Sequence, residues 1–480
     1  MKKISTLLLL TLLIFLSKNA KSQNDTLEIL ILHTNDMHSS IDRMPAIMWK
    51  INEIKQNNKY VFLVSAGDMF TGNPLVDKFE KPGFPMIELM NEMGYIVASL
   101  GNHEFDYEQE NLELRRKQAN FPIICANINT SANNVLSKFD NIFELTIADS
   151  IKIGFLGLIH REDNKLPASH PAKLTNLSFE DPIKTAKSYK NYKDSFNIFI
   201  CLSHCGIEID ELLAKKVNFF DVIIGGHSHT VLPQGKKVKN TFIVQAGSKF
   251  SYLGVLKIKY FKDKIVWLSD SLISVKTIKE VDSNILSIVT NYNKSCDLNY
   301  VIGENIVELT NKQELGALIT SAMLDTTKSE IAFQNIGGIR INELPKGPIT
   351  FKQILELQPF GNTMFVLELT PKEIEQLVRY SYNLSKENEL VVGGAKIKLT
   401  ITQKDKKLEK LEIFDLNGKP LENRKYKVVV NDYMSTAYKL KFLQKGVNTY
   451  INDAITVSNY IQKHGKIDFS KQKNIEIIEK

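Results

Sequence analysis

Length, composition and charge are those of an ordinary globular protein. The chain has 480 residues, 43% of them hydrophobic and 24% charged, and this length exceeds what one hydrophobic core usually organises, so we expect two domains. The net charge of +7 is spread along the chain without a basic tract interleaved with aromatic residues, which argues against a nucleic-acid partner and mildly favours anionic small molecules.

The first 22 residues have the features of a secretory signal peptide. Lys2 and Lys3 precede an apolar run at residues 7–16 that is too short to cross a bilayer, and Ala20-Lys21-Ser22 fits a cleavage site. An uncleaved anchor is the alternative. No later apolar run has transmembrane length. We therefore expect an exported protein, periplasmic or extracellular, without a stable membrane anchor.

Residues 25–275 have the pattern of an α/β domain. Short apolar runs, as expected for strands covered on both faces, alternate with polar or amphipathic stretches. Helices are predicted at residues 45–56 and 104–118. Strands are predicted at residues 27–32, 60–64, 95–100, 123–126, 151–158, 196–202, 220–224 and 242–245.

A polar segment at residues 276–301 follows, and helical periodicity at 281–292 predicts a linker helix. Residues 302–480 form a second α/β region, with helices predicted near 315–325 and 372–382 and strands at 396–402, 408–414 and 425–430. Four cysteines at irregular spacing select no disulfide pairing, and Cys125 and Cys201, which lie in apolar runs, are predicted to be buried free thiols.

Metal-ligating residue types follow five of the apolar strands of the first region. Ligands at the carboxyl ends of strands converge when the strands share a sheet. Each residue alone is explained by a turn, a cap or a structural hydrogen bond, but together they predict a metal site. The candidates are Asp36 and His38, Asp68, Asn102 and His103, His204, and His227 and His229. The other histidines (His33, His160, His170 and His464) are interpreted as structural.

The candidates suit two ions better than one. Imidazole and carboxylate ligands favour Zn²⁺, Mn²⁺, Fe²⁺ or Co²⁺ over soft metals. About seven ligands are too many for a single ion, whereas two ions that share a bridging carboxylate can hold both the attacking and the leaving oxygen of a phosphoryl displacement.

The order DxH, GD, GNHEFD, SH and GHSH resembles the calcineurin-like metallophosphoesterases. The segments at residues 32–38 and 101–106 resemble the 5′-nucleotidase branch, which also includes UDP-sugar hydrolases and 2′,3′-cyclic-nucleotide phosphodiesterases. The resemblance implies a four-layer αββα sandwich followed by a smaller α/β substrate-binding domain. It implies a catalytic pair, His103 and Asp106, and two metal sites that share Asp68. One site comprises Asp36, His38, Asp68 and His229, and the other comprises Asp68, Asn102, His204 and His227.

The second region resembles the substrate-binding half of that family. Residues 335–340 resemble the family's NGGGIR loop, which implies that Arg340 binds an anion and that Asn335 contacts base or sugar. Phe360 and Tyr433 match the two aromatic residues that stack on the base. Arginines that the family often has before the first helix of this half are absent from residues 309–315.

A second departure lies after Tyr433, where the family often carries a GGD motif whose carboxylate holds the ribose hydroxyls. Lys439 stands in its place here, and an ammonium group cannot accept a hydrogen bond. If Lys439 faces the pocket, ribonucleotides and deoxyribonucleotides should be discriminated poorly.

We therefore expect a phosphoesterase that acts on a small-molecule nucleotide, with the oligomeric state left open. The alternatives are an enzyme of the same family for 2′,3′-cyclic nucleotides or another organic phosphate, a non-enzymatic nucleotide-binding protein, and an exonuclease. The intact set of metal ligands argues against the non-enzymatic protein, and the missing basic groove argues against the exonuclease.

Overall fold

The computed structural model describes residues 26–131, 134–162, 165–295, 298–470 and 472–480. The predicted signal peptide at residues 1–22 and Cys296 lie outside them. Cys125, Cys201 and Cys205 are buried free thiols, as predicted for the first two. Within the described residues, no helix combines the length and the apolar character needed to cross a bilayer.

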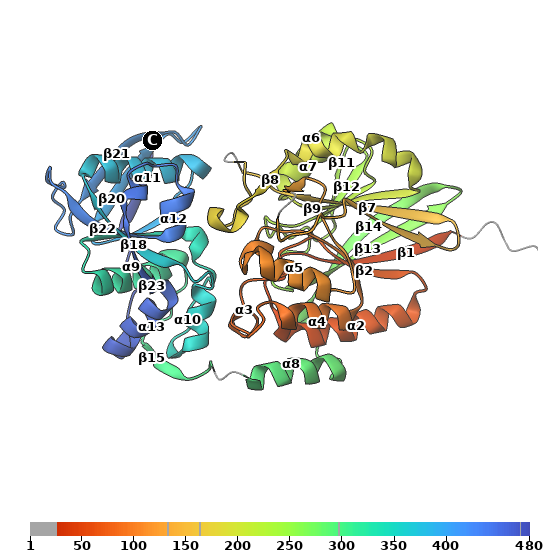
Figure 1. The fold of residues 1–480 in the computed structure, drawn as a ribbon, viewed down its shortest axis with the longest axis horizontal. Helices are drawn as coiled ribbons and strands as arrows, with labels where there is room; N and C mark the ends of the chain where they lie inside the picture. The colour runs from red at the N-terminus through yellow and green to blue at the C-terminus, as the bar shows by residue number, and fades with distance from the viewer. Residues whose placement is uncertain (1–25, 132–133, 163–164, 296–297, 471) are drawn as a thin grey trace, which may run out of the picture.

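Two six-stranded sheets form the centre of the first part of the chain (Figure 1). The first runs in the order β14 (Lys264–Ser274), β13 (Tyr252–Phe261), β1 (Leu27–Thr34), β2 (Val61–Ser65), β3 (Tyr95–Ser99) and β4 (Ile123–Ile124). The second runs in the order β11 (Lys236–Val238), β12 (Thr241–Val244), β10 (Val222–Gly225), β9 (Ile198–His204), β7 (Ile151–Ile159) and β6 (Ile142–Ile147). A two-stranded ribbon pairs β5 (Ile128–Thr130) with β8 (Leu177–Phe179).

Alternating side chains explain why these sheets need cover on both faces. Along β9, Ile198, Ile200 and Leu202 belong to a core shared with the first sheet, whereas Phe199 and Cys201 pack in the core on the opposite face. Helices cover that outer face and the outer face of the first sheet, which confirms the four-layer αββα arrangement. On the first sheet these are α2 (Met44–Asn57), α3 (Pro74–Asp77), α4 (Phe84–Met93), α5 (Glu108–Gln118) and α8 (Ser283–Ser295), and on the second α6 (Pro182–Ser188) and α7 (Ile207–Lys216).

The helix expected near residues 281–292 exists as α8 and packs on the first part. Ile285 and Val289 are buried in the core beside α2 and α4. Strand β14, which was not predicted, lies at the edge of its sheet and ends at Ser274, just before the polar segment. Helix α5 begins at Glu108, since residues before it form a separate 3-10 turn, η2 (His103–Phe105).

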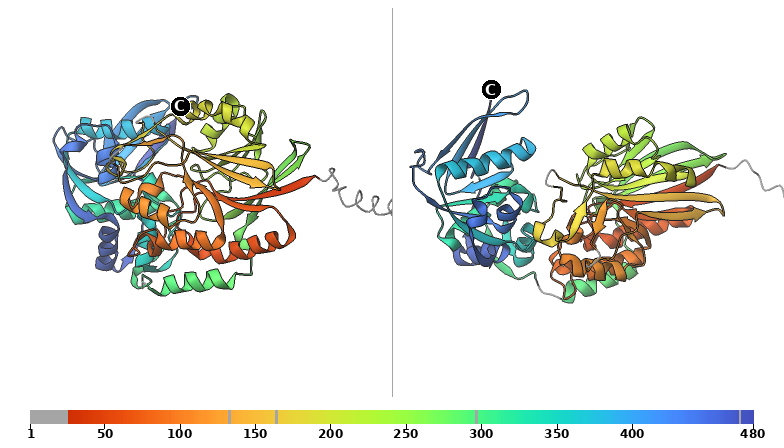
Figure 2. Two further views of the ribbon diagram at one scale, coloured as in Figure 1. Left: turned by 45° about the vertical axis from the view of Figure 1, so that its right-hand side comes forward. Right: turned by 45° about the horizontal axis from the view of Figure 1, so that its top comes forward.

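The second part is a smaller α/β unit that lies at the end of the sandwich opposite the start of β1 (Figures 1 and 2). Its main sheet has the order β19 (Leu390–Gly393), β16 (Ile331–Asn335), β22 (Tyr426–Asn431), β18 (Thr363–Leu369) and β23 (Val447–Asn452). Helices lie on both faces: α9 (Lys312–Thr327), α10 (Phe351–Leu357) and α13 (Asp453–His464) share one core, and α11 (Pro371–Ser385) lies in another, followed along the chain by α12 (Asp432–Ala437).

Two small sheets complete this part. One has the order β17 (Gly347–Thr350), β15 (Val301–Asn305) and β24 (Lys466–Ile467), and the other β21 (Leu408–Phe414), β20 (Lys396–Ile401) and β25 (Ile475–Glu479).

Short 3-10 helices in both parts of the chain are η1 (Ile41–Arg43), η3 (Pro171–Leu174), η4 (Lys190–Ser195), η5 (Val275–Thr277), η6 (Ile336–Gly338) and η7 (Leu443–Lys445).

Candidate active site

The strand ends converge as the sequence predicts. Strands β1, β2 and β3 are parallel neighbours in the first sheet, and β9 and β10 are parallel neighbours in the second. Each is followed by one or two of the predicted ligands, so the residues from both sheets meet at one edge of the sandwich. The seven candidates are Asp36, His38, Asp68, Asn102, His204, His227 and His229, and their role as ligands stays a prediction.

The backbone around these residues is strained. Five of the seven candidates have a positive φ, between 47° and 74°: Asp36, His38, Asp68, His227 and His229. A non-glycine residue in this region costs of the order of 1–3 kcal/mol and persists only where its surroundings enforce it, commonly at functional sites. Gly101 allows the tight approach, because a Cβ there would lie 2.3 Å from Oδ1 of Asp68.

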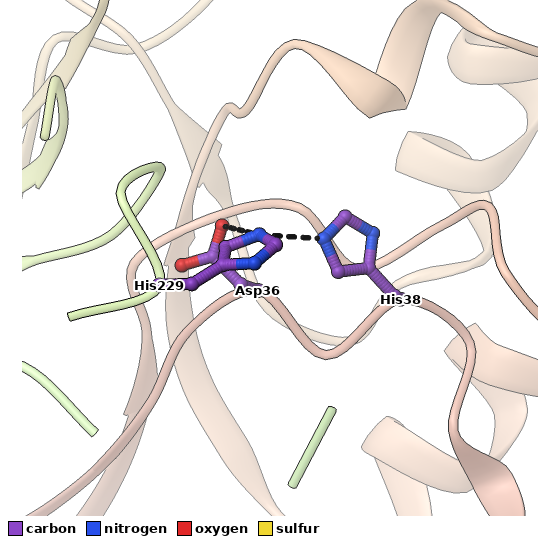
Figure 3. A group of neighbouring side chains, drawn as sticks. All are labelled: Asp36, His38 and His229. Carbon is purple, nitrogen blue, oxygen red and sulfur yellow. Dashed lines mark hydrogen bonds and ion pairs between the residues drawn. The ribbon is translucent and has the colours of Figure 1, made fainter. Parts of the chain in front are cut away.

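Asp36, His38 and His229 form the first group (Figure 3). Nε2 of His229 lies 3.1 Å from Nε2 of His38 and 3.4 Å from Oδ1 of Asp36. Nδ1 of His38 faces the carbonyl oxygens of Phe70 and Thr71, at 3.3 and 3.1 Å. Because carbonyls only accept, Nδ1 carries the proton and Nε2 directs its lone pair into the group.

Asp68, Asn102, His204 and His227 form the second group. Nδ1 of His204 donates to the carbonyl of Ala66 at 2.7 Å, so its Nε2 faces Oδ2 of Asp68 at 3.1 Å and Oδ1 of Asn102 at 3.2 Å. Nδ1 of His227 lies 2.9 Å from the same Asn102 oxygen. Asp68 also falls in a group with His38 and His103, so it lies between the two sets of ligands.

This donor set fits divalent cations. Burial opposes a charge on His204, yet Asp68 and Asp36 raise the pKa of its imidazole to about 10, which shows how strongly this site favours positive charge. Burial and the Arg340 guanidinium hold the pKa of His38 well below its usual range, so this ring is neutral and able to ligate. In metal sites, imidazole lone pairs and carboxylate oxygens typically converge on one point. The other nitrogen of each imidazole is often held by a hydrogen bond to a carbonyl, as it is here for His38 and His204.

His103 and Asp106 are a bonded pair. Nδ1 of His103 lies 2.6 Å from Oδ2 of Asp106, so the carboxylate orients the ring and leaves Nε2 toward Asp68, whose Oδ2 is 4.0 Å away. Burial opposes protonation, but Asp106 and Asp68 together raise the pKa of His103. An oriented imidazole that holds its proton can donate a hydrogen bond to a charged oxygen.

Glu104 is a positioning residue that the sequence reasoning missed. Its buried carboxylate accepts backbone hydrogen bonds from Gly101 at 2.6 Å, from Asp68 at 3.1 Å and from Met69 at 2.7 Å. It therefore ties the loop after β2 to the loop after β3. The signal in the sequence is only its place inside the GNHEFD segment.

One cavity of about 520 Å³ joins the two parts of the chain. Arg340 reaches across and its Nη2 donates to Nε2 of His38 at 3.2 Å. The ring of Phe360 stacks on that of His103, with centroids 5.5 Å apart and planes at 15°. All four predicted substrate-binding residues, Asn335, Arg340, Phe360 and Tyr433, line this cavity together with Asp68, Asn102, His103, Asp106, His227 and His229.

The structural interpretation of four histidines has mixed outcomes. His33 is buried outside the cavity, with Nε2 3.1 Å from Asp270. His160 stacks on His227 at 4.9 Å, and His170 lines the cavity and approaches Thr436 at 3.5 Å. These two do have partners at the site, which the sequence could not reveal because the contacts are between distant segments.

The pocket differs from the expectation in two further places. Lys439 is exposed and lies outside the residues that line the cavity, so the condition for poor ribose discrimination is not met. Asp432, which the sequence reasoning passed over, does line it. Burial and the Arg340 guanidinium lower the pKa of Lys312, which lies in the segment without arginines and outside the residues that line the cavity.

Comparisons with known proteins find similarity along both parts. Residues 29–231 match the calcineurin-like phosphoesterase family, and residues 301–441 match the 5′-nucleotidase C-terminal domain. The 5′-nucleotidase of Bos taurus is 28% identical in an alignment that covers 92% of this chain and 91% of the bovine protein. The trifunctional nucleotide phosphoesterase protein YfkN of Bacillus subtilis (strain 168) is 29% identical in an alignment that covers 73% of this chain and 27% of that protein. The crystal structure of a 5′-nucleotidase precursor from Thermus thermophilus has a TM-score of 0.83 and 25% identity, with 94% of this chain and 99% of that one covered.

Proposed function

The chain belongs to the calcineurin-like metallophosphoesterases of the 5′-nucleotidase type, and from that premise we propose that it is an exported enzyme that hydrolyses nucleotide phosphate esters with two divalent metal ions. The observation that carries the proposal is the shared cavity. Carboxylates and imidazoles able to hold cations form one wall, and a guanidinium and two aromatic rings from the other part of the chain form the opposite wall. A nucleotide has a phosphate for the first wall and a flat base for the second.

We assign Asp36, His38, Asp68 and His229 to one ion and Asp68, Asn102, His204 and His227 to the other. The support is the 2.9–3.4 Å spacing of neighbouring ligand atoms within the groups and the position of Asp68 between them. Bound ions would supply Lewis-acid polarisation of the phosphoryl group and a nucleophile at neutral pH. Their identity among Zn²⁺, Mn²⁺, Fe²⁺ and Co²⁺ is left open.

The protein's own groups then handle charge and position. His103, oriented by Asp106, donates a hydrogen bond to the phosphoryl or leaving oxygen as negative charge develops there. Arg340 binds the phosphate as a fork of donors, while Phe360 and Tyr433 stack on the base and Asn335 contacts base or sugar. The 3.2 Å contact between Nη2 of Arg340 and Nε2 of His38 supports this role, because it brings the guanidinium next to a proposed metal ligand.

We divide the chain into residues 25–275, a linker at 276–301, and 302–480. Separate hydrophobic cores support the division, since few residues of one part of the chain pack in a core of the other part. Leu75 is one member of the sandwich that packs in a core of the second part. The signal-peptide pattern at residues 1–22 supports export to the periplasm or the exterior.

A hydrolysis screen tests the proposal. The chain from Gln23 onward is assayed with Mn²⁺, Zn²⁺ or Co²⁺ against AMP, ATP, UDP-glucose, 2′,3′-cyclic AMP and bis(p-nitrophenyl) phosphate, with His38→Ala as the inactive control. We expect phosphate release from AMP or ATP that a chelator abolishes. Preference for the cyclic nucleotide would instead support the related phosphodiesterase activity, and hydrolysis of bis(p-nitrophenyl) phosphate alone would contradict a nucleotide substrate.

A further inference from the structure

Asp432 occupies a position in the cavity beside the proposed base-stacking ring. Strand β22 ends at Asn431, and Asp432 and Tyr433 begin helix α12. Both of these residues line the cavity, as do Phe360 and Asn362 from the facing loop. Asp432 therefore lines the cavity directly beside Tyr433, the ring that we propose to stack on the base.

One oxygen of this carboxylate lacks a partner. Oδ2 accepts a hydrogen bond from the hydroxyl of Thr363 at 3.0 Å. Oδ1 is buried, and within the described part of the chain no donor reaches it. A buried charged acceptor without a donor costs free energy, so this oxygen is suited to a donor that arrives with a ligand.

The chemistry of a nucleotide supplies that donor. The sugar is bonded directly to the base, so a residue that binds the sugar hydroxyls must lie beside a ring that stacks on the base. We propose that Asp432 is the specificity residue that accepts hydrogen bonds from the ribose hydroxyls, in place of the carboxylate missing at Lys439. This inference rests on the proposed function, because it presumes a nucleotide in the cavity.

Lys439 does not compete for this role, because it is exposed beyond the end of α12 and outside the cavity lining. A purely structural role for Asp432 is the main rival. A carboxylate in the first turn of a helix is favourable in itself, and the bond from Thr363 ties α12 to β18. Loss of a structural role would lower the hydrolysis of every substrate alike. Loss of sugar recognition would lower the hydrolysis only of substrates that carry the ribose hydroxyls.

The test compares AMP with 2′-deoxy-AMP and 3′-deoxy-AMP, and uses bis(p-nitrophenyl) phosphate as a substrate without ribose. Wild type should prefer AMP by tenfold or more in kcat/KM. Asp432→Ala should lower kcat/KM for AMP by roughly 10- to 100-fold, as expected for loss of a hydrogen bond to a charged group, and bring the AMP preference close to one. The same variant should hydrolyse bis(p-nitrophenyl) phosphate at the wild-type rate. Lys439→Ala is the matched control and should keep the preference.

Two milder variants keep the test decisive if Asp432→Ala folds poorly. Asp432→Asn keeps the shape and removes the charge, and Thr363→Val releases Oδ2, so both should lower the AMP preference by a smaller factor. An unchanged preference in all three variants, or a wild type without any preference, overturns the inference while AMP hydrolysis itself supports the proposed function. Failure to hydrolyse any nucleotide, with bis(p-nitrophenyl) phosphate still cleaved, contradicts the proposed function and the inference together.

Discussion

Arg340 brings a cation from the second part of the chain to His38, one of the predicted metal ligands. Its Nη2 lies 3.2 Å from His38, its guanidinium lies 5.5 Å from the centre of the Phe360 ring, and its carbonyl accepts a bond from Lys249 at 3.0 Å. Only the first two of these contacts involve the side chain. Arg340→Ala therefore removes the anion-binding fork and keeps the backbone bond to Lys249.

The expected loss of kcat/KM in Arg340→Ala follows from the burial of the Arg340 guanidinium. Truncating one partner of a buried, hydrogen-bonded charge pair costs about 2–4 kcal/mol, which corresponds to a fall of about 30- to 1,000-fold in kcat/KM for AMP. Arg340→Lys keeps the charge and loses the fork, so its loss should be intermediate. We expect bis(p-nitrophenyl) phosphate, which has neither base nor sugar, to reach the predicted metal ligands without help from the second part of the chain, so its hydrolysis should fall by less than about threefold.

The assay measures kcat/KM for both substrates together with the melting temperature of each variant. Arg424→Ala is the matched control, because it removes an exposed ion pair with Glu330 in the same part of the chain, and exposed pairs contribute little. Equal losses on AMP and bis(p-nitrophenyl) phosphate in Arg340→Ala would refute the reasoning, since they would show that Arg340 supports the fold and does not recognise the substrate.

Three other predictions follow from the same geometry. Asp68→Ala should abolish hydrolysis and reduce bound metal to one ion or none per chain, because this carboxylate lies between both ligand groups; two ions found by mass spectrometry would exclude the bridging role. His103→Ala should keep the metal content and lower kcat by roughly 10²–10³, the usual loss for one transition-state donor, whereas a parallel loss of metal would make His103 a ligand. Burial raises the pKa of Asp453 to about 7, so between about pH 4 and pH 7 the folded state holds a proton that the unfolded state has released. The free energy of unfolding should therefore fall by up to about 1.4 kcal/mol per pH unit as pH rises through this range. Asp453→Asn should remove this slope in urea unfolding at pH 5 and pH 7, and parallel profiles for wild type and variant would show that Asp453 is ionised in the folded protein.

The α/β class and the convergence of the ligands were predictable because both depend on local pattern. Short apolar runs such as that of β9 are typical of strands covered on both faces, and polar residues at the ends of neighbouring parallel strands meet at one edge of the sheet. Edge strand β14 was missed although residues 265–268 are apolar, because this run is followed at once by the polar residues Ser269, Asp270 and Ser271.

The cavity could not be predicted in the same way. Arg340 and His38 are 302 positions apart, and His170 and Thr436 are 266 apart, so no spacing in the sequence encodes these contacts. The sequence left open whether Lys439 faces the pocket, because its distance along the chain from Tyr433 does not reveal where the helix between them ends. Helix α12 stops at Ala437, and Lys439 beyond it is exposed.

Metal stoichiometry tests the central claim most directly. The chain from Gln23 onward is stripped with a chelator and titrated with Mn²⁺ while AMP hydrolysis is followed. We expect no activity in the stripped protein and a rise in activity that saturates at two ions per chain. Full activity without metal, or saturation at one ion per chain, would contradict this claim.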